Sequence, residues 1–208
     1  MIKNLIFDFG KVLVDYDFVR IIHSFFPDKA EDLTAYCRLI LDSDFMDRCD
    51  REDEPLEEII AEEKRKHPHL ATQIQLFYDR FDEFILGEME GMRSLLQQLK
   101  QKGFRLYGLT NWSHLVHGVM RKYEIFSLLD GSVISSEEHV IKPEPEIYHR
   151  LCRKFDLRPE ECFFADDKLV NVEGALRVGM KAAVFTTAEQ YVRDLCHEIP
   201  QLEGQLLL

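Results

Sequence analysis

Hydrophobic residues follow two different patterns along the chain. A short apolar run at 2–8 ends in a carboxylate and predicts a buried strand. From about 18 to 86 no glycine occurs, and apolar residues recur three and four positions apart. That spacing is typical of amphipathic helices, and Pro27, Pro55 and Pro68 are expected to interrupt them.

Beyond residue 87 the pattern alternates between short apolar runs and amphipathic stretches. Strands are expected at 104–109, 131–135, 161–165 and 182–186. Helices are expected at 89–102, 113–122 and 172–178, and from Pro143 or Pro145 to residue 155, with Gly103 and Gly179 as stops. Strands separated by helices predict a parallel sheet with right-handed crossovers.

The first strand is expected to belong to this same sheet. A lone strand followed by a long helical block can neither satisfy its own backbone nor bury both of its faces. We therefore predict an α/β fold with a Rossmann-like parallel-sheet core made of residues 1–16 and 87–208. Residues 17–86 would be an inserted, all-helical cap domain.

Composition and charge narrow the class of protein. The 208 residues are 46% hydrophobic and include 15 Phe, which is enough for a buried core. The net charge of −12 disfavours nucleic acid and anionic membranes as partners. The five Cys form no CxxC motif, and neither a signal peptide nor a long uncharged span is evident, so a cytoplasmic location is expected. The oligomeric state is not indicated.

Polar residues stand where several predicted strands end, and ligands of open α/β sheets bind at the carboxyl ends of the strands. The residues in question are Asp8, Thr110, Asn111, Asp166 and Asp167, with Lys142 between a strand and a helix. Taken singly, each would also suit a turn or a helix cap. Taken together, clustered carboxylates require a cation, and hard oxygen ligands suit Mg²⁺. With a lysine nearby, such a site would hold a phosphoryl group, and Asp8 would be its nucleophile.

Four segments in sequence order carry a family resemblance. They are Asp8-Phe-Gly-Lys-Val-Leu after a hydrophobic strand, Leu109-Thr110-Asn111, Lys142-Pro143-Glu144, and Phe163-Phe-Ala-Asp166-Asp167-Lys-Leu-Val-Asn171. In this order and spacing the chain resembles the haloacid dehalogenase superfamily of phosphohydrolases, whose helical cap follows the first strand.

The resemblance implies a role for each of these residues. Asp8 would be the nucleophile, Thr110 and Asn111 would bind the transferred phosphoryl group, and Lys142 would offset charge between them. The metal ligands would be Asp8, the backbone carbonyl of Gly10, Asp167 and, through indirect or water-mediated contact, Asp166.

Two positions depart from the family pattern. Phosphatases of the family usually carry a second Asp two places after the nucleophile, as general acid and base, and here that residue is Gly10. Losing such a group removes roughly 10²- to 10⁴-fold of rate unless something substitutes, and Asp15 or Asp17 would be candidates. Some sugar-phosphate phosphatases of the superfamily share the Asp-x-Gly-x-Val opening. Asn171 stands where many relatives have Asp, which would weaken Mg²⁺ binding.

The predicted function is that of a Mg²⁺-dependent phosphomonoester hydrolase acting through an aspartyl-phosphate on a small metabolite such as a sugar phosphate. One alternative is a catalytically weak or inactive protein that binds a phosphometabolite or a partner. A second is a metal-independent 2-haloacid dehalogenase. Substrate contacts from the cap are expected among Phe18, Arg20, Phe45 and Arg48, and the acidic run 49–54 is expected to be an exposed loop.

Overall fold

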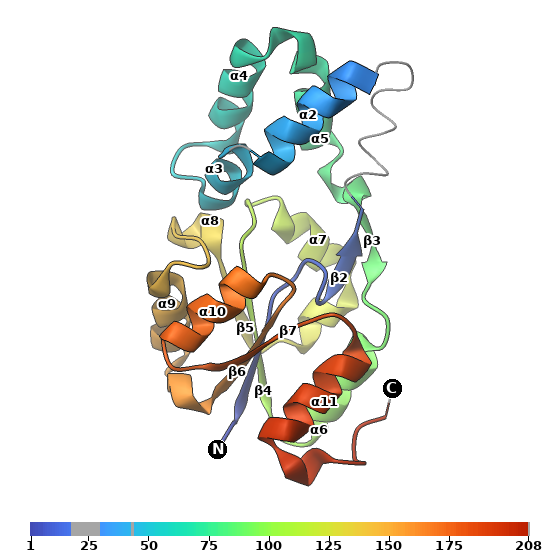
Figure 1. Ribbon diagram of the computed structural model, residues 1–208, viewed down its shortest axis with the longest axis vertical. Coiled ribbons are helices and arrows are strands. Elements are labelled where there is room, and N and C mark those ends of the chain that lie inside the picture. The colour runs from blue at the N-terminus through green and yellow to red at the C-terminus, as the bar shows by residue number, and fades with distance from the viewer. Residues whose placement is uncertain (18–29, 43, 208) are drawn as a thin grey trace.

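The computed structural model describes residues 1–17, 30–42 and 44–207 (Figure 1). Its centre is a sheet of five parallel strands in the order β5-β4-β1-β6-β7. Their bounds are Asn4–Phe7 (β1), Arg105–Thr110 (β4), Gly131–Ile134 (β5), Cys162–Asp166 (β6) and Lys181–Val184 (β7). The parallel order confirms the predicted α/β class.

The first strand of the chain is the central strand of the sheet. Asn4 of β1 pairs with Arg105 of β4 on one side and with Cys162 of β6 on the other. All four β1 residues are buried, as expected for a parallel strand covered on both faces. The sheet is therefore assembled from both ends of the sequence, as the lone first strand predicts.

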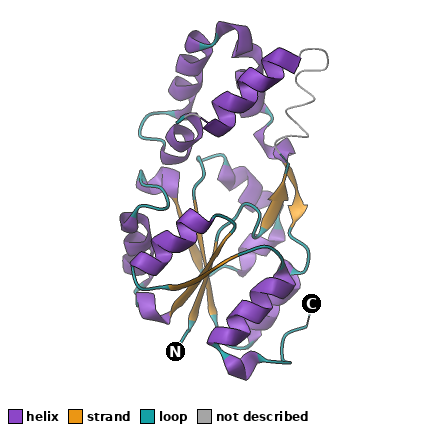
Figure 2. Cartoon of the chain, viewed as in Figure 1, coloured by secondary structure: helices purple, strands orange, loops and turns teal. Residues whose placement is uncertain are grey.

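Helices cover both faces of this sheet (Figure 2). Leu5 and Phe7 of β1 share a hydrophobic cluster with α6 and α11, whereas Ile6 shares a second cluster with α9 and α10. Successive side chains of a strand point to opposite faces, so the two clusters are the two sides of a three-layer, Rossmann-like core. The bounds are Met92–Gln101 (α6), Pro145–Phe155 (α9), Leu169–Arg177 (α10) and Ala188–Glu198 (α11).

Shorter elements complete this part of the chain. They are α7 (Val116–Lys122), α8 (Ser135–Glu138) and the 3₁₀ turns η3 (Glu124–Leu128), η4 (Pro159–Glu161) and η5 (Pro200–Leu202). The sequence pattern did not predict α11, and α10 begins at Leu169 rather than at the expected residue 172. The positive φ of Gly179 agrees with its expected place just beyond the end of α10.

A helical block, residues 30–84, forms the upper end of the molecule in Figure 1. Its elements are α2 (Ala30–Asp42), α3 (Phe45–Arg51), α4 (Leu56–Lys66), η1 (Pro68–Leu70), α5 (Ala71–Asp79) and η2 (Phe81–Phe84). Pro55 and Pro68 stand where α4 and η1 begin, positions that need no backbone N–H. Pro27 lies outside the described residues. Inside the block, Phe77 packs on Phe45 and Phe84 at centroid distances of 6.5 and 5.2 Å.

Two short strands connect the helical block to the sheet. β2 (Val14–Tyr16) and β3 (Ile85–Glu88) pair antiparallel, so the chain enters and leaves the block side by side. Within this pair Val14 lies opposite Glu88, and Tyr16 lies opposite Ile85. The pairing joins distant parts of the sequence, which is why no local pattern predicts it.

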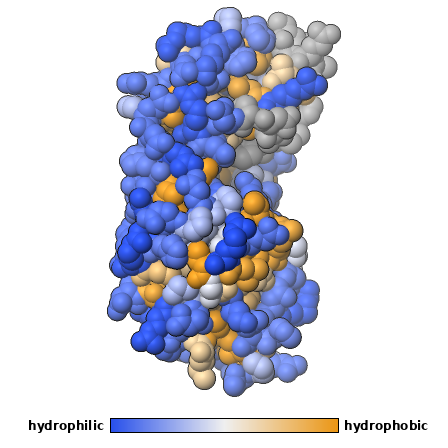
Figure 3. Space-filling model, turned by 60° about the vertical axis from the view of Figure 1, so that its left-hand side comes forward, coloured by the Kyte–Doolittle hydropathy of each residue, from blue (hydrophilic) through white to orange (hydrophobic). Residues whose placement is uncertain are grey.

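The surface is polar over much of the helical end. Figure 3 shows one face on which the helical block is mostly hydrophilic, with the larger hydrophobic areas on the half that contains the sheet. Of the helices in the described ranges, none combines the length and hydrophobicity that crossing a bilayer requires.

Candidate active site

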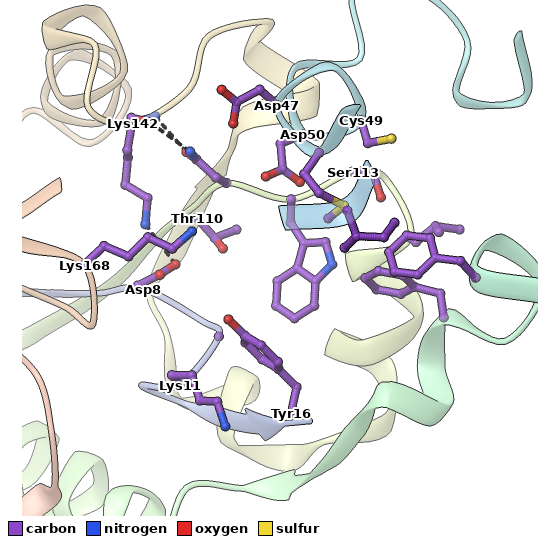
Figure 4. Close-up of a pocket in the computed structure, with 18 of the residues that line it drawn as sticks. Asp8, Lys11, Tyr16, Asp47, Cys49, Asp50, Thr110, Ser113, Lys142 and Lys168 are labelled. Carbon is purple, nitrogen blue, oxygen red and sulfur yellow. Dashed lines mark hydrogen bonds and ion pairs between the residues drawn. The ribbon is translucent and has the colours of Figure 1, made fainter. Parts of the chain in front are cut away.

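The polar strand ends meet at one edge of the sheet, as their placement predicts. Asp8 follows β1, Thr110 ends β4 and Asp166 ends β6. Lys142 reaches the same edge from the segment between α8 and α9. Figure 4 shows Asp8, Thr110 and Lys142 converging at the base of a cavity.

Lys142 joins the carboxylates of two strands. Its Nζ lies 2.9 Å from Asp8 Oδ1 and 2.6 Å from Asp166 Oδ2, and it also donates to the Leu109 carbonyl at 3.0 Å. The side chain is almost fully buried. Burial alone would lower the pKa of Lys142, but attraction to Asp166 and Asp8 outweighs it and raises the pKa. The lysine therefore stays charged and offsets the two carboxylates.

Asp8 is buried, and the backbone N–H of Phe9 donates a hydrogen bond to its Oδ1 at 2.7 Å. This bond fixes the orientation of the carboxylate. Burial raises the pKa of Asp8 to about 6; Lys142 opposes the rise, and Asp166 and Asp167 add to it. Most Asp8 side chains are then ionised at neutral pH, and any further cation at the site would favour that form. This is the charge state a nucleophile needs.

Asp166 and Asp167 are adjacent in sequence but differ in surroundings. Asp166 is fully buried and accepts hydrogen bonds from Lys142 Nζ, the Lys168 backbone N–H and Asn171 Nδ2, so both of its oxygens are engaged. Asp167 is partly exposed and lines the cavity, and burial and Asp166 raise its pKa.

Three carboxylates at this edge are close enough to share a cation. Oxygens of Asp8, Asp166 and Asp167 lie within 4.8 Å of one another, and Gly10 lines the same cavity. Hard, anionic oxygen ligands are those that Mg²⁺ prefers. Asp166 is held by its neighbours, so the carboxylates that face the cavity are those of Asp8 and Asp167, and Gly10 lines the cavity with them.

Thr110 and Asn111 have different surroundings. Thr110 is buried at the end of β4 and lines the cavity. The Asn111 carboxamide accepts from Lys142 N–H at 2.7 Å and donates to the Lys142 carbonyl at 2.9 Å. Asn111 also lines the cavity, but these two bonds make it the residue that holds the Lys142 segment in position.

The space beside Gly10 is filled by Tyr16. A Cβ placed on Gly10 would lie 2.7 Å from Tyr16 Cε1 and 3.7 Å from Cζ. Figure 4 shows the Tyr16 hydroxyl directed into the cavity. Burial raises the pKa of Tyr16, and the carboxyls of Asp167, Asp8 and Asp50 add to the rise. The phenol therefore stays protonated at neutral pH.

Asp15 and Asp17, the candidates for replacing the missing carboxyl, lie in different places. Asp15 pairs with Lys11 at 2.6 Å and is half exposed. Asp17 lines the cavity, where β2 ends. Asn171, the second departure from the family pattern, lines the cavity and donates its amide to Asp166.

The cavity has a volume of about 690 Å³ and lies between the sheet edge and the helical block. Lining residues from the block include Met46, Asp50, Ile60, Phe77 and Phe81. The expectation of an exposed loop at 49–54 holds only for 52–54, which connect α3 to α4. Residues 49–51 are the last turn of α3, and Asp50 faces the cavity (Figure 4). Burial raises the pKa of Asp50 to about 7, against the attraction of Lys168.

Two expected substrate contacts point elsewhere. Phe45 is fully buried in the helical block, and Arg48 pairs with Glu54, Glu62 and Glu63. Neither lines the cavity. Phe18 and Arg20 lie outside the described residues. Polar residues that line the cavity and that the sequence did not single out include Tyr16, Asp50 and Lys168.

Known proteins with similar sequences identify the family to which the chain belongs. The sequence profile of the haloacid dehalogenase-like hydrolase family matches residues 2–179. The chain therefore belongs to this family.

Individual relatives match over shorter segments. A flavin mononucleotide hydrolase of Arabidopsis thaliana is 29% identical over 107 residues, which are 51% of this chain and 44% of that protein. A sesquiterpene phosphatase of Aspergillus oryzae is 34% identical over 114 residues, 54% of this chain and 56% of that protein. The chain spans about half the length of the curated relatives it matches.

Among solved structures, a family enzyme of Bacteroides thetaiotaomicron in complex with magnesium and inorganic phosphate aligns with a TM-score of 0.74. The identity is 22%, and the alignment covers 93% of this chain and 98% of that one. At this identity the likeness shows a shared fold.

Proposed function

We propose that this protein is a Mg²⁺-dependent phosphomonoester hydrolase that acts through an aspartyl-phosphate on Asp8. The observation that carries the proposal is the Lys142 ammonium at 2.9 Å from Asp8, beside the three clustered carboxylates. The relatives named as a hydrolase of flavin mononucleotide and a sesquiterpene phosphatase support a phosphate ester as substrate. The substrate would be a small soluble metabolite, such as a sugar phosphate, and the location cytoplasmic.

In this proposal Asp167, Asp8 and the Gly10 carbonyl would hold the magnesium ion, and Asp166 would support the site from behind by holding Lys142. A bound magnesium ion supplies positive charge that offsets the charge of the phosphoryl oxygens. The solved family enzyme that holds magnesium and inorganic phosphate agrees with this choice of ion.

The chain's own groups would carry out the transfer. Asp8 attacks phosphorus, the ester P–O bond breaks, and the alcohol leaves. Lys142 and Thr110 hold the phosphoryl oxygens, and Asn111 keeps Lys142 in place. Water then attacks the aspartyl-phosphate and releases inorganic phosphate.

We also propose that residues 17–86 act as a cap domain over a core of residues 1–16 and 87–208. The cavity is lined from both sides, and the paired β2 and β3 are the connection on which the cap would move. Closure of such a cap would exclude bulk water from the phosphoryl transfer.

The test is a phosphate-release screen over sugar phosphates, nucleotides and other metabolite esters, run with Mg²⁺ or with EDTA, on the wild type and on Asp8→Asn. We expect Mg²⁺-dependent release by the wild type and none by Asp8→Asn. Tight ester binding without release would favour a binding protein. Halide release in EDTA would favour a dehalogenase. Against that function, carboxylates this close to Asp8 without a cation would raise its pKa and make it a weaker nucleophile.

A further inference from the structure

Cleavage of an alkyl phosphate leaves an alkoxide that needs a proton, and the position two residues after Asp8 carries no side chain to provide one. Tyr16 fills the space beside that position. Its Cε1 and Cζ lie 2.7 and 3.7 Å from where a Cβ on Gly10 would stand. The ring edge thus fills the side-chain space at position 10, and the hydroxyl, on Cζ, lies farther out and is directed into the cavity (Figure 4).

The pairing of β2 with β3 holds Tyr16 in this place. Tyr16 lies opposite Ile85 across the two strands, and Lys11 Nζ lies 4.9 Å from the centre of its ring. The Lys11 ammonium is itself held by Asp15 at 2.6 Å. The phenol lies in the electrostatic field of Asp167, Asp8 and Asp50, the carboxyls around the reaction centre.

We infer that the Tyr16 hydroxyl is the proton donor to the leaving group, in place of the carboxyl that Gly10 lacks. This inference rests on the proposed phosphatase function. As the bond from Asp8 Oδ to phosphorus forms and the ester P–O bond breaks, the leaving oxygen takes the Tyr16 proton. In the second half-reaction water attacks phosphorus and the Asp8–phosphorus bond breaks. The proton that the water loses returns to the Tyr16 phenolate.

The test measures the first half-reaction alone. The rate at which Tyr16→Phe releases the leaving group from a phosphate ester is measured in a single turnover. The Phe variant keeps the ring beside Gly10 and removes only the hydroxyl. We expect release from an alkyl phosphate to fall by roughly 10²- to 10⁴-fold, the range of general acid catalysis. Release from p-nitrophenyl phosphate, whose leaving group needs little protonation, should be nearly unchanged. Equal losses for both substrates, or no loss for either, would overturn the inference.

Tyr78→Phe is the matched control. Tyr78 also lines the cavity, but its hydroxyl bonds to Glu57 at 2.9 Å on the exposed surface. Removing the Tyr78 hydroxyl should leave the rate of leaving-group release unchanged for both substrates. Asp17→Asn and Asp50→Asn test the other acids of the cavity. If one of these two variants releases the leaving group more slowly from the alkyl phosphate only, and Tyr16→Phe keeps the wild-type rate, that acid is the proton donor. This result would refute the role of Tyr16.

Moving the acid from Tyr16 to position 10 separates a role in proton transfer from a purely structural effect of the Tyr16 substitution. Gly10→Asp alone should not help, because its Cβ would meet the Tyr16 ring at 2.7 Å. The double variant Gly10→Asp, Tyr16→Ala should release the leaving group from the alkyl phosphate at least ten times faster than Tyr16→Ala alone. An unchanged rate would contradict the idea that a proton donor is needed in the space beside position 10. A wild type that releases no leaving group from any ester would instead refute the proposed function.

Discussion

Lys142→Met should destabilise the protein strongly and in a pH-dependent way. The change removes the cation that Asp8 and Asp166 share, at 2.9 and 2.6 Å. At an effective dielectric constant of about 20, each attraction amounts to roughly 6 kcal/mol before the cost of desolvation is counted. Removing one partner of a buried ion pair typically costs about 3–5 kcal/mol, because the other charge is left unpaired. We expect a loss in that range at pH 8.

The pH dependence follows from the carboxyls, since the pKa of Lys142 is raised and the lysine stays charged from pH 5 to 8. Without Lys142, the pKa of Asp8 should rise above its value of about 6. A carboxyl whose pKa is raised in the folded state costs stability above that pKa, and the cost fades as pH falls and the group is protonated. The loss should therefore be smaller at pH 5 than at pH 8.

Urea unfolding in EDTA at the two pH values measures this loss. Lys122→Met is the control, because Lys122 is an exposed lysine at the end of α7 and does not line the cavity. The stability lost in this variant should stay within about 0.5 kcal/mol. A loss below about 1 kcal/mol for Lys142→Met at pH 8, or equal losses at both pH values, would refute the electrostatic reasoning.

Three further predictions concern the same cavity. Mg²⁺ should raise the Tm of the wild type more at pH 8 than at pH 5.5 in scanning fluorimetry, because protons compete for Asp8, whose pKa is about 6, and Asp167→Asn should abolish the rise. Asn111→Ala should cost about 1–3 kcal/mol in urea unfolding and should slow phosphate release, since both backbone groups of Lys142 lose their partner; unchanged activity would count against the positioning role. Asp50→Asn should raise the Tm at pH 8 but not at pH 5, because burial raises the pKa of Asp50 to about 7 and its ionised form costs stability above that pH; a gain at both would show another cause.

The parts of the site that the sequence predicts are those fixed by strand ends. A parallel sheet places its carboxyl ends at one edge, so Asp8, Thr110 and Asp166 come together once the strands are recognised. The apolar runs that mark those strands are local features of the sequence, and their expected bounds differ from the structure by a few residues.

The parts that the sequence leaves open depend on pairings between distant segments. Tyr16 lies beside Gly10 because β2 pairs with β3. Asp50 faces the cavity because α3 extends into the first residues of the acidic run, as far as Arg51. The role of Asn111 in holding Lys142 likewise depends on a contact across 31 residues. Such contacts leave no periodicity in the sequence.

Identifying the phosphorylated residue tests the proposed aspartyl-phosphate on Asp8 most directly. The wild type is mixed with a radiolabelled ester that it turns over and quenched in acid within one turnover, and its peptides are mapped by mass spectrometry. We predict an acyl phosphate, sensitive to hydroxylamine, on the peptide that contains Asp8. Phosphate release with the label on another residue, or with no labelled protein at any time point, would contradict it.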